Sequence, residues 1–294
     1  MLFLQNLIGG LSRGSVYAII ALGYTMVYGI AKMLNFAHGD IIMVGGYVSY
    51  FALTKFGMPA IAAVLLSMLV CTVLGIVIER LAYRPLRSAA SLAVLITAIG
   101  VSYFLQNGAQ LLWSSNPRFY TSIVAAYKPI KLFGGQVTVS IEALITIVSC
   151  VIITVMLVLV TQHTKMGKAM RAVSEDKGAS QLMGINMNLT ISATFAIGSA
   201  LAAVAGVLMC STYPTLMPTT GSMPGIKAFT AAVFGGIGSI PGAFLGGILL
   251  GIIEQMSQAY ISTQVSDAIV FAVLIIVLLV KPTGLLGKMQ QEKV

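Results

Sequence analysis

Charged side chains are scarce in this sequence. Only 9% of the 294 residues are Asp, Glu, Lys or Arg, whereas soluble globular proteins contain about 25%. Hydrophobic residues make up 58%, and the mean hydropathy is +0.97. So few charges exclude an ordinary soluble domain. The sequence predicts an all-α integral membrane protein whose apolar spans occupy nearly the whole chain, as a single transmembrane domain over residues 1–294.

Acidic residues are rarer than basic ones, with 8 Asp and Glu against 17 Lys and Arg. In a soluble protein the resulting net charge of +9 would suggest a nucleic-acid partner. In an apolar chain, basic residues instead set the membrane topology and contact anionic lipid. We therefore expect membrane lipid, and no nucleic acid, among the partners.

Motifs of catalysis and cofactor binding are missing as well. No Walker A sequence occurs, so we expect that this chain does not itself bind ATP. No nucleophile and base are recognisable as a pair. The three cysteines, Cys71, Cys150 and Cys210, fall within or at the end of apolar spans and lack ligand-like spacing. We expect neither an enzyme nor a metal or other cofactor in this chain.

Apolar segments that are candidates for crossing a bilayer recur about eight times along the chain. We expect spans at residues 14–30, 35–53, 56–78, 88–113, 139–161, 189–210, 240–256 and 266–280. Residues 1–11 are amphipathic, and a charged Arg13 would be costly within a span. The sequence therefore predicts an interfacial segment before the first helix. Residues 114–138 are expected to form an exposed loop. Prolines and glycines interrupt residues 211–240. Alternation of the spans requires residues 227–240 to cross part or all of the membrane, as a half-helix, a re-entrant loop or a short span.

The hydrophilic loop at residues 162–189 carries signals of internal helical order. In its first half, Met166, Ala169, Met170 and Val173 recur at positions i, i+3, i+4 and i+7. This spacing predicts a short amphipathic helix.

A second short helix is expected in the same loop. Ser174 is a suitable N-cap, and Glu175 and Asp176 follow in the first turn, where the helix dipole favours acids. A small apolar face and a glycine that suits a left-handed helix end come next. The predicted docking residues are Arg171, Ser174, Glu175, Asp176, Ala179, Leu182, Met183 and Gly184. This pattern favours a docking element over the simpler alternative of a basic tether.

Small residues recur at every fourth position in two places. The two sets are Gly198, Ala202 and Gly206, and Gly238, Gly242 and Gly246. Such spacing lets helix backbones approach closely in lipid, where hydrophobicity does not distinguish helix contacts from lipid contacts. We expect each set to form a packing face.

Three segments together resemble a known family. They are MLNFAHGDIIMVGGYV, shortly after Gly29 and Ile30, FGGIGSIPGAFLGG at residues 234–247, and the loop at residues 175–185. The chain is similar, over essentially its whole length, to the branched-chain amino-acid family of ABC importer permeases. The resemblance implies an all-helical, type II-like permease architecture, whose loop places a short helix into a cleft on a partner ATPase.

The resemblance also implies a function and a set of partners. The implied function is that of the permease subunit of an ATP-driven importer. The implied partners are a second related or identical permease, two cytoplasmic ATPases that bind ATP and Mg²⁺, and an external binding protein. The implied substrates are branched-chain amino acids, with urea or short amides as an alternative. A secondary transporter without an ATPase is an alternative of another class. The implied location is the inner (plasma) membrane of a bacterium, with several passes.

Orientation follows from the basic residues. If residues 162–189 are cytoplasmic, alternation of the spans places eleven of the 17 Lys and Arg residues on the same side. This bias agrees with the positive-inside rule.

The broken, glycine-rich segments predict the translocation path, because irregular backbone at membrane depth occurs only where it is buried or lines a cavity. The candidate residues are Asn35, His38, Asp40, Gly45, Gly46, Gly235, Gly236 and Gly238. We interpret Asp40 as stabilising a helix start, and Glu142, Glu254 and Asp267 as lying near span ends. The path is expected to be apolar or weakly polar, and a dedicated site on Asp40 or Glu254 is the competing view.

Overall fold

The structure is a computed structural model that describes residues 2–87, 89–124, 128–132 and 137–287. The expected start of the fourth span at Ser88 lies outside the described residues. So do Lys288 and Lys293, two of the basic residues counted for the orientation.

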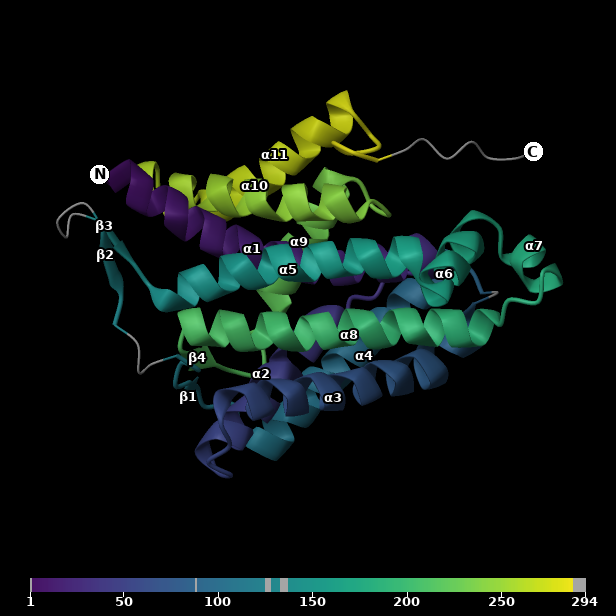
Figure 1. The fold of residues 1–294 in the computed structure, drawn as a ribbon, viewed down its shortest axis with the longest axis horizontal. Helices are drawn as coiled ribbons and strands as arrows, with labels where there is room; N and C mark the ends of the chain where they lie inside the picture. The colour runs from purple at the N-terminus through teal and green to yellow at the C-terminus, as the bar shows by residue number, and fades with distance from the viewer. Residues whose placement is uncertain (1, 88, 125–127, 133–136, 288–294) are drawn as a thin grey trace.

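The described chain is a bundle of long helices with a few two- or three-residue strands at one end (Figure 1). The long helices of the first half are α1 (Leu2–Ala31), α2 (His38–Thr54), α3 (Ala60–Ile78), α4 (Ser91–Trp113) and α5 (Ile141–His163). A π-helical turn, η1 (Glu79–Tyr83), and a 3₁₀ turn, η2 (Arg84–Leu86), extend α3. The remaining helices are α6 (Lys165–Glu175), α7 (Lys177–Leu182), α8 (Met187–Thr212), α9 (Ser222–Gly235), α10 (Ile240–Tyr260) and α11 (Ser266–Val280).

Every expected span corresponds to a helix, but the helices differ in length. Within the described residues, six segments are long and apolar enough to cross a membrane: α1, α3 with its extension to Leu86, α4, α5, α8 and α10. Helix α2 has 17 residues and α11 has 15. At about 1.5 Å per residue these two measure roughly 25 Å and 22 Å, which is less than the hydrocarbon core of about 30 Å.

The first helix differs from the sequence prediction. No break separates residues 2–11 from the first span, because α1 runs unbroken from Leu2 and includes Arg13. The guanidinium does not end the helix, since an acid on α10 pairs with it, as described below. Helix α1 is also the centre of the bundle: Ala18 to Leu22 are fully buried, and α10, α8, α9 and α5 pack around it.

Two helices, α2 and α9, begin within the bundle rather than at its ends. A methyl group on Gly23, in the middle of α1, would lie 2.5 Å from His38 Nε2 at the start of α2. A methyl group on Gly39 would lie 2.7 Å from the carbonyl oxygen of Gly221, just before α9. Non-helical residues 32–37 therefore lead back into the bundle from the end of α1. Within residues 211–240 the structure shows a helix of 14 residues, α9. How residues 227–240 cross the membrane stays a prediction.

The expected loop at residues 114–138 contains short strands. Strand β1 (Arg118–Phe119) pairs antiparallel with β4 (Thr215–Leu216), with Arg118 opposite Leu216. Strand β2 (Ile130–Leu132) pairs antiparallel with β3 (Val137–Val139), with Ile130 opposite Val139. These ladders lie at the end of the bundle opposite α6 and α7 (Figure 1). We call these two ends the strand end and the α7 end.

Candidate functional site

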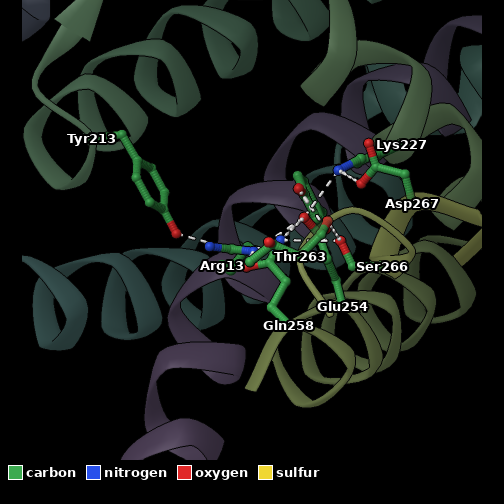
Figure 2. A network of polar contacts seen from close by, with 9 residues as sticks. Arg13, Tyr213, Lys227, Glu254, Gln258, Thr263, Ser266 and Asp267 are labelled. Atoms are coloured by element: carbon green, nitrogen blue, oxygen red, sulfur yellow. Dashed lines mark hydrogen bonds and ion pairs between the residues drawn. The ribbon is translucent and has the colours of Figure 1, made fainter. Parts of the chain in front are cut away.

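A cluster of charged side chains joins four helices toward the strand end (Figure 2). Glu254 of α10 lies at its centre and is 3% exposed. Glu254 Oε1 lies 3.1 Å from Arg13 Nη1 of α1 and 2.9 Å from Lys227 Nζ of α9. Lys227 Nζ also lies 2.6 Å from Asp267 Oδ1 of α11. Two acids thus face two bases, which meets the requirement that charges at membrane depth be paired.

Hydrogen bonds fix the orientation of this charge cluster. Tyr17 OH donates to Glu254 Oε2 at 2.7 Å, so both carboxylate oxygens have partners. Arg13 donates from Nε to Tyr213 OH at 2.9 Å and from Nη1 to Gln258 Oε1 at 2.6 Å. Gln258 Nε2 in turn donates to Glu254 Oε1 at 3.2 Å. The charges therefore have their hydrogen-bonding capacity largely met within the protein.

A pocket of about 290 Å³ lies against this charge cluster. Its polar lining consists of Arg13, Tyr17, Glu254 and Gln258 from the cluster, together with Tyr213, Thr215 and Thr220. Val16, Met209 and Pro224 supply its apolar surface. A small solute that enters here meets hydrogen-bond donors and acceptors of both signs beside an apolar wall.

The partners of Glu254 were not anticipated from the sequence. The sequence predicts only that Glu254 lies near a span end, yet it is the most connected member of the cluster. The sequence did contain a signal. Arg13 and Lys227 each stand in an apolar helix, and an unpaired base there is costly, so each requires an acid nearby.

Asp40 lies where α2 and α9 begin. It occupies the first turn of α2, as interpreted from the sequence, and is buried. The structure adds a partner: Gln106 Nε2 of α4 donates to Asp40 Oδ1 at 2.8 Å. The same amide lies 3.2 Å from Ser222 Oγ, at the first residue of α9. Three elements far apart in sequence thus share one partly buried polar contact.

The other two polar path candidates are buried beside this region. Asn35 Oδ1 accepts a hydrogen bond of 2.9 Å from Tyr83 OH, which ties residues 32–37 to the π-helical turn η1. The His38 ring lies 4.6 Å from the Tyr24 ring, measured between centroids. Neither residue lines the pocket described above.

The glycine path candidates lie at close contacts within this chain. A methyl group on Gly45 would lie 2.8 Å from Ala203 Cα, and one on Gly46 would lie 3.0 Å from Leu216 Cδ1. The chain likewise packs closely around Gly235 and Gly236, against Gly242 and Gly287. A role for these glycines in lining the path stays a prediction.

The expected packing faces have the following partners. A methyl group on Gly198 would lie 3.2 Å from Val27 Cγ2, and one on Gly206 would clash with the carbonyl oxygen of Ile42. Methyl groups on Gly242 and Gly246 would clash with carbonyl oxygens of Gly235 and Ala231 in α9.

Gly238 does not belong to that face, contrary to the prediction. It lies in the turn before α10 with φ of +94°, and a methyl group there would approach Gly29 at 4.0 Å. The fourfold spacing misleads at Gly238 because the helix does not begin until Ile240.

The first helix of the loop at residues 162–189 forms as predicted, and its apolar side is covered. Met170 and Val173 are buried, because α6 packs against α5, α1 and α8. Arg171 lies on the exposed side. The apolar stripe of α6 thus anchors the loop to the bundle and offers little surface to a partner.

The second helix begins two residues later than predicted. Ser174 is not its N-cap, because Ser174 belongs to α6 and donates from Oγ to the carbonyl oxygen of Arg171 at 2.7 Å. Glu175 is the last residue of α6. The N-cap is Asp176, whose Oδ1 accepts from the backbone N–H of Ala179 at 2.9 Å. Either side chain is a suitable cap, and the extended backbone of Asp176 selects it.

The end and the exposed face of α7 agree with the sequence pattern. Gly184 has a φ of +80°, which is the expected left-handed helix end. Leu182 is 90% exposed and Met183 is 82% exposed, and Ala179 is exposed beside them. Lys177 Nζ donates to the carbonyl oxygen of Ala31 at 3.0 Å, which connects α7 to the end of α1.

The apolar spans and the paired buried charges define a multi-pass helical membrane protein. The family model for the permease component of branched-chain amino acid transport systems matches residues 6–278. The chain belongs to this family.

Several curated proteins are similar over nearly the whole chain. The high-affinity branched-chain amino acid transport system permease protein LivH of Escherichia coli strain K12 is 44% identical over 303 residues, which cover 99% of this chain and 98% of LivH. BraD of Pseudomonas aeruginosa, a permease protein of the same description, is 44% identical over 304 residues, with coverage of 99% and 98%. The ribose import permease protein RbsC of Escherichia coli strain K12 is 24% identical over 261 residues, with coverage of 86% and 77%.

Proposed function

We propose that this chain is the transmembrane permease subunit of an ATP-driven ABC importer for branched-chain amino acids. The observation that carries the proposal is the 44% identity to LivH and BraD over 99% of the chain. Both relatives are described as permease proteins of branched-chain amino acid transport. In this proposal the chain resides in the bacterial inner membrane, pairs with a second, homologous permease and receives substrate from an external binding protein.

The proposal assigns ATP hydrolysis to two partner ATPases, which bind ATP and Mg²⁺. Helix α7 supports this assignment, because its capped end presents exposed Leu182 and Met183 on an otherwise polar loop. Apolar side chains exposed in this way are typical of a surface that a partner covers. The docking residues are then Ala179, Leu182 and Met183, with Asp176 and Gly184 holding the helix in shape.

We propose further that the translocation path runs beside the two helix breaks at residues 32–37 and 213–221. The polar contact among Asp40, Gln106 and Ser222 supports this placement, because it lies where α2 and α9 begin. Helices broken at membrane depth are typical of transport pathways. Substrate affinity resides chiefly in the external binding protein, so the path itself holds the amino acid weakly.

Uptake into proteoliposomes tests the proposal. The chain is reconstituted with its partner permease, ATPases and binding protein, and uptake of labelled leucine, isoleucine, valine and urea is measured with and without internal ATP. We expect uptake of the three amino acids that requires ATP and the binding protein. Uptake of urea alone would contradict the substrate assignment. Leucine uptake that persists without ATPases would indicate a secondary transporter.

A further inference from the structure

A second pocket, of about 470 Å³, lies at the α7 end of the bundle. It is lined by Arg84 and Arg87 from the extension of α3, by Lys177 from α7, and by Met187 and Asn188 from the start of α8. No acidic residue is among these lining residues. The lining is therefore strongly positive, in contrast to the neutral charge cluster toward the strand end.

Internal partners neutralise only part of this charge. Arg87 forms an ion pair with buried Glu79 and donates to Asn188 Oδ1 at 2.6 Å, so its charge is balanced and its position is fixed. Among the described residues, neither Arg84 nor Lys177 forms an ion pair. Lys177 instead donates to a neutral acceptor, the carbonyl oxygen of Ala31.

The energetics of the cluster favour an anion. Burial lowers the pKa of Lys177, and the nearby positive charges of Arg87 and Lys32 lower it further. Bringing like charges together costs free energy unless an anion joins them. The start of α8 adds to the attraction, because the first N–H groups of a helix have no acceptor within it and carry partial positive charge.

The depth of the pocket matches a lipid headgroup. Counting about 1.5 Å per residue from Ala60, Arg84 lies roughly 36 Å along the apolar segment, which is just beyond a hydrocarbon core of about 30 Å. Leu81 and Leu92, which flank Arg84 and Arg87 in the sequence, are both exposed. Basic side chains at the headgroup level beside exposed leucines provide contacts for both ends of one lipid.

We propose that this pocket binds the phosphate headgroup of an anionic phospholipid. Arg84 and Lys177 contact the phosphate, Arg87 is held in place by Glu79, and Leu81 and Leu92 contact the acyl chains. Because Lys177 belongs to α7, a bound lipid would also steady the base of that helix. The inference does not depend on the substrate or on the identity of the partners.

Native mass spectrometry of the purified full chain tests the proposal. The protein is exchanged into detergent with phosphatidylglycerol, with phosphatidylcholine or with inorganic phosphate. The test variant is Arg84→Gln with Lys177→Gln. The control is Lys165→Gln with Lys168→Gln, which removes the same charge from exposed positions on α6. We expect one retained phosphatidylglycerol per wild-type chain and no retained phosphatidylcholine.

In the test variant, retention of phosphatidylglycerol should weaken roughly thirtyfold, which corresponds to about 1 kcal/mol for each basic residue, and the control should match the wild type. If all three proteins retained phosphatidylglycerol equally, or if both variants lost it equally, this pocket would not be the lipid site. Inorganic phosphate that binds as tightly as the lipid would overturn the lipid as the source of the anion.

Discussion

Glu254 shows how one acid can hold several helices together in lipid. It contacts bases on α1 and α9 and a tyrosine on α1, while Lys227 extends the connection to α11 through Asp267. Removing one partner from a buried ion pair leaves an uncompensated charge, which costs more than the pair itself contributes. The stability of these four helices should therefore depend on Glu254 more than on any exposed acid.

Glu254→Gln should destabilise the protein by about 3–5 kcal/mol, because Arg13 then lacks a carboxylate and Lys227 keeps only Asp267. Asp267→Asn is the matched control. The side chain of Asp267 is 39% exposed, so this change should cost about 1 kcal/mol or less. Unfolding of the purified variants in detergent measures both effects. An equal loss of stability in the two variants would contradict the central position of Glu254.

The same variant separates a structural role of Glu254 from substrate binding. If Glu254 serves stability, folded Glu254→Gln protein should take up every substrate with an unchanged apparent KM. A large rise in apparent KM confined to amino acids would instead indicate that the pocket beside Arg13 holds the substrate's charged groups.

Asp176 and Ser174 provide a residue-level test of the α7 end. Asp176→Ala should destabilise α7 by about 1 kcal/mol, because it removes the acceptor for the N–H of Ala179. Ser174→Ala should have a smaller effect, since its hydroxyl bonds within α6. The rate of amide hydrogen exchange at residues 177–182 measures the stability of α7 directly. Faster exchange in Ser174→Ala than in Asp176→Ala would restore Ser174 as the cap.

At the scale of elements, the sequence predicts helix number and position well and helix starts poorly. Apolar run length identifies a helix at each of the eight expected positions, and six of these helices are long enough to match the bilayer thickness. It does not reveal that α1 continues through Arg13, since that depends on Glu254, 241 residues later. Nor does it reveal that α2 starts deep in the bundle, because the contact between His38 and Gly23 exists only after α1 and α2 pack.

The contact between α9 and α10 depends on the absence of a side chain at Gly242. Gly242→Leu should lower stability by about 1–3 kcal/mol or more, because its side chain would push against the backbone of Gly235. Gly100→Leu is the control, since nothing lies within 4 Å of a methyl group at that exposed position of α4. Resistance to unfolding in detergent and uptake in proteoliposomes are compared between the two variants. Normal assembly of Gly242→Leu would show that the contact is dispensable.

At the scale of the whole molecule, the two ends of the bundle differ in character. Toward the strand end lies a neutral, paired charge cluster beside a pocket. The α7 end carries Arg84 and Lys177, which form no ion pair with any described residue, and exposed apolar side chains. Lys177 links α7 to the end of α1, and residues 32–37 continue from there to Asp40. One hydrogen bond and a few residues of chain therefore connect α7 to the start of α2.

The most direct test of the account is ATP-driven leucine uptake by the assembled transporter after a change confined to α7. Leu182→Asp with Met183→Asp places charges on the proposed docking surface, and Gln181→Asp changes an exposed polar neighbour on the same helix. We predict that the double variant folds in the membrane but fails to retain the ATPases and takes up no leucine, whereas Gln181→Asp behaves as wild type. Normal ATPase retention and uptake in the double variant would contradict the account.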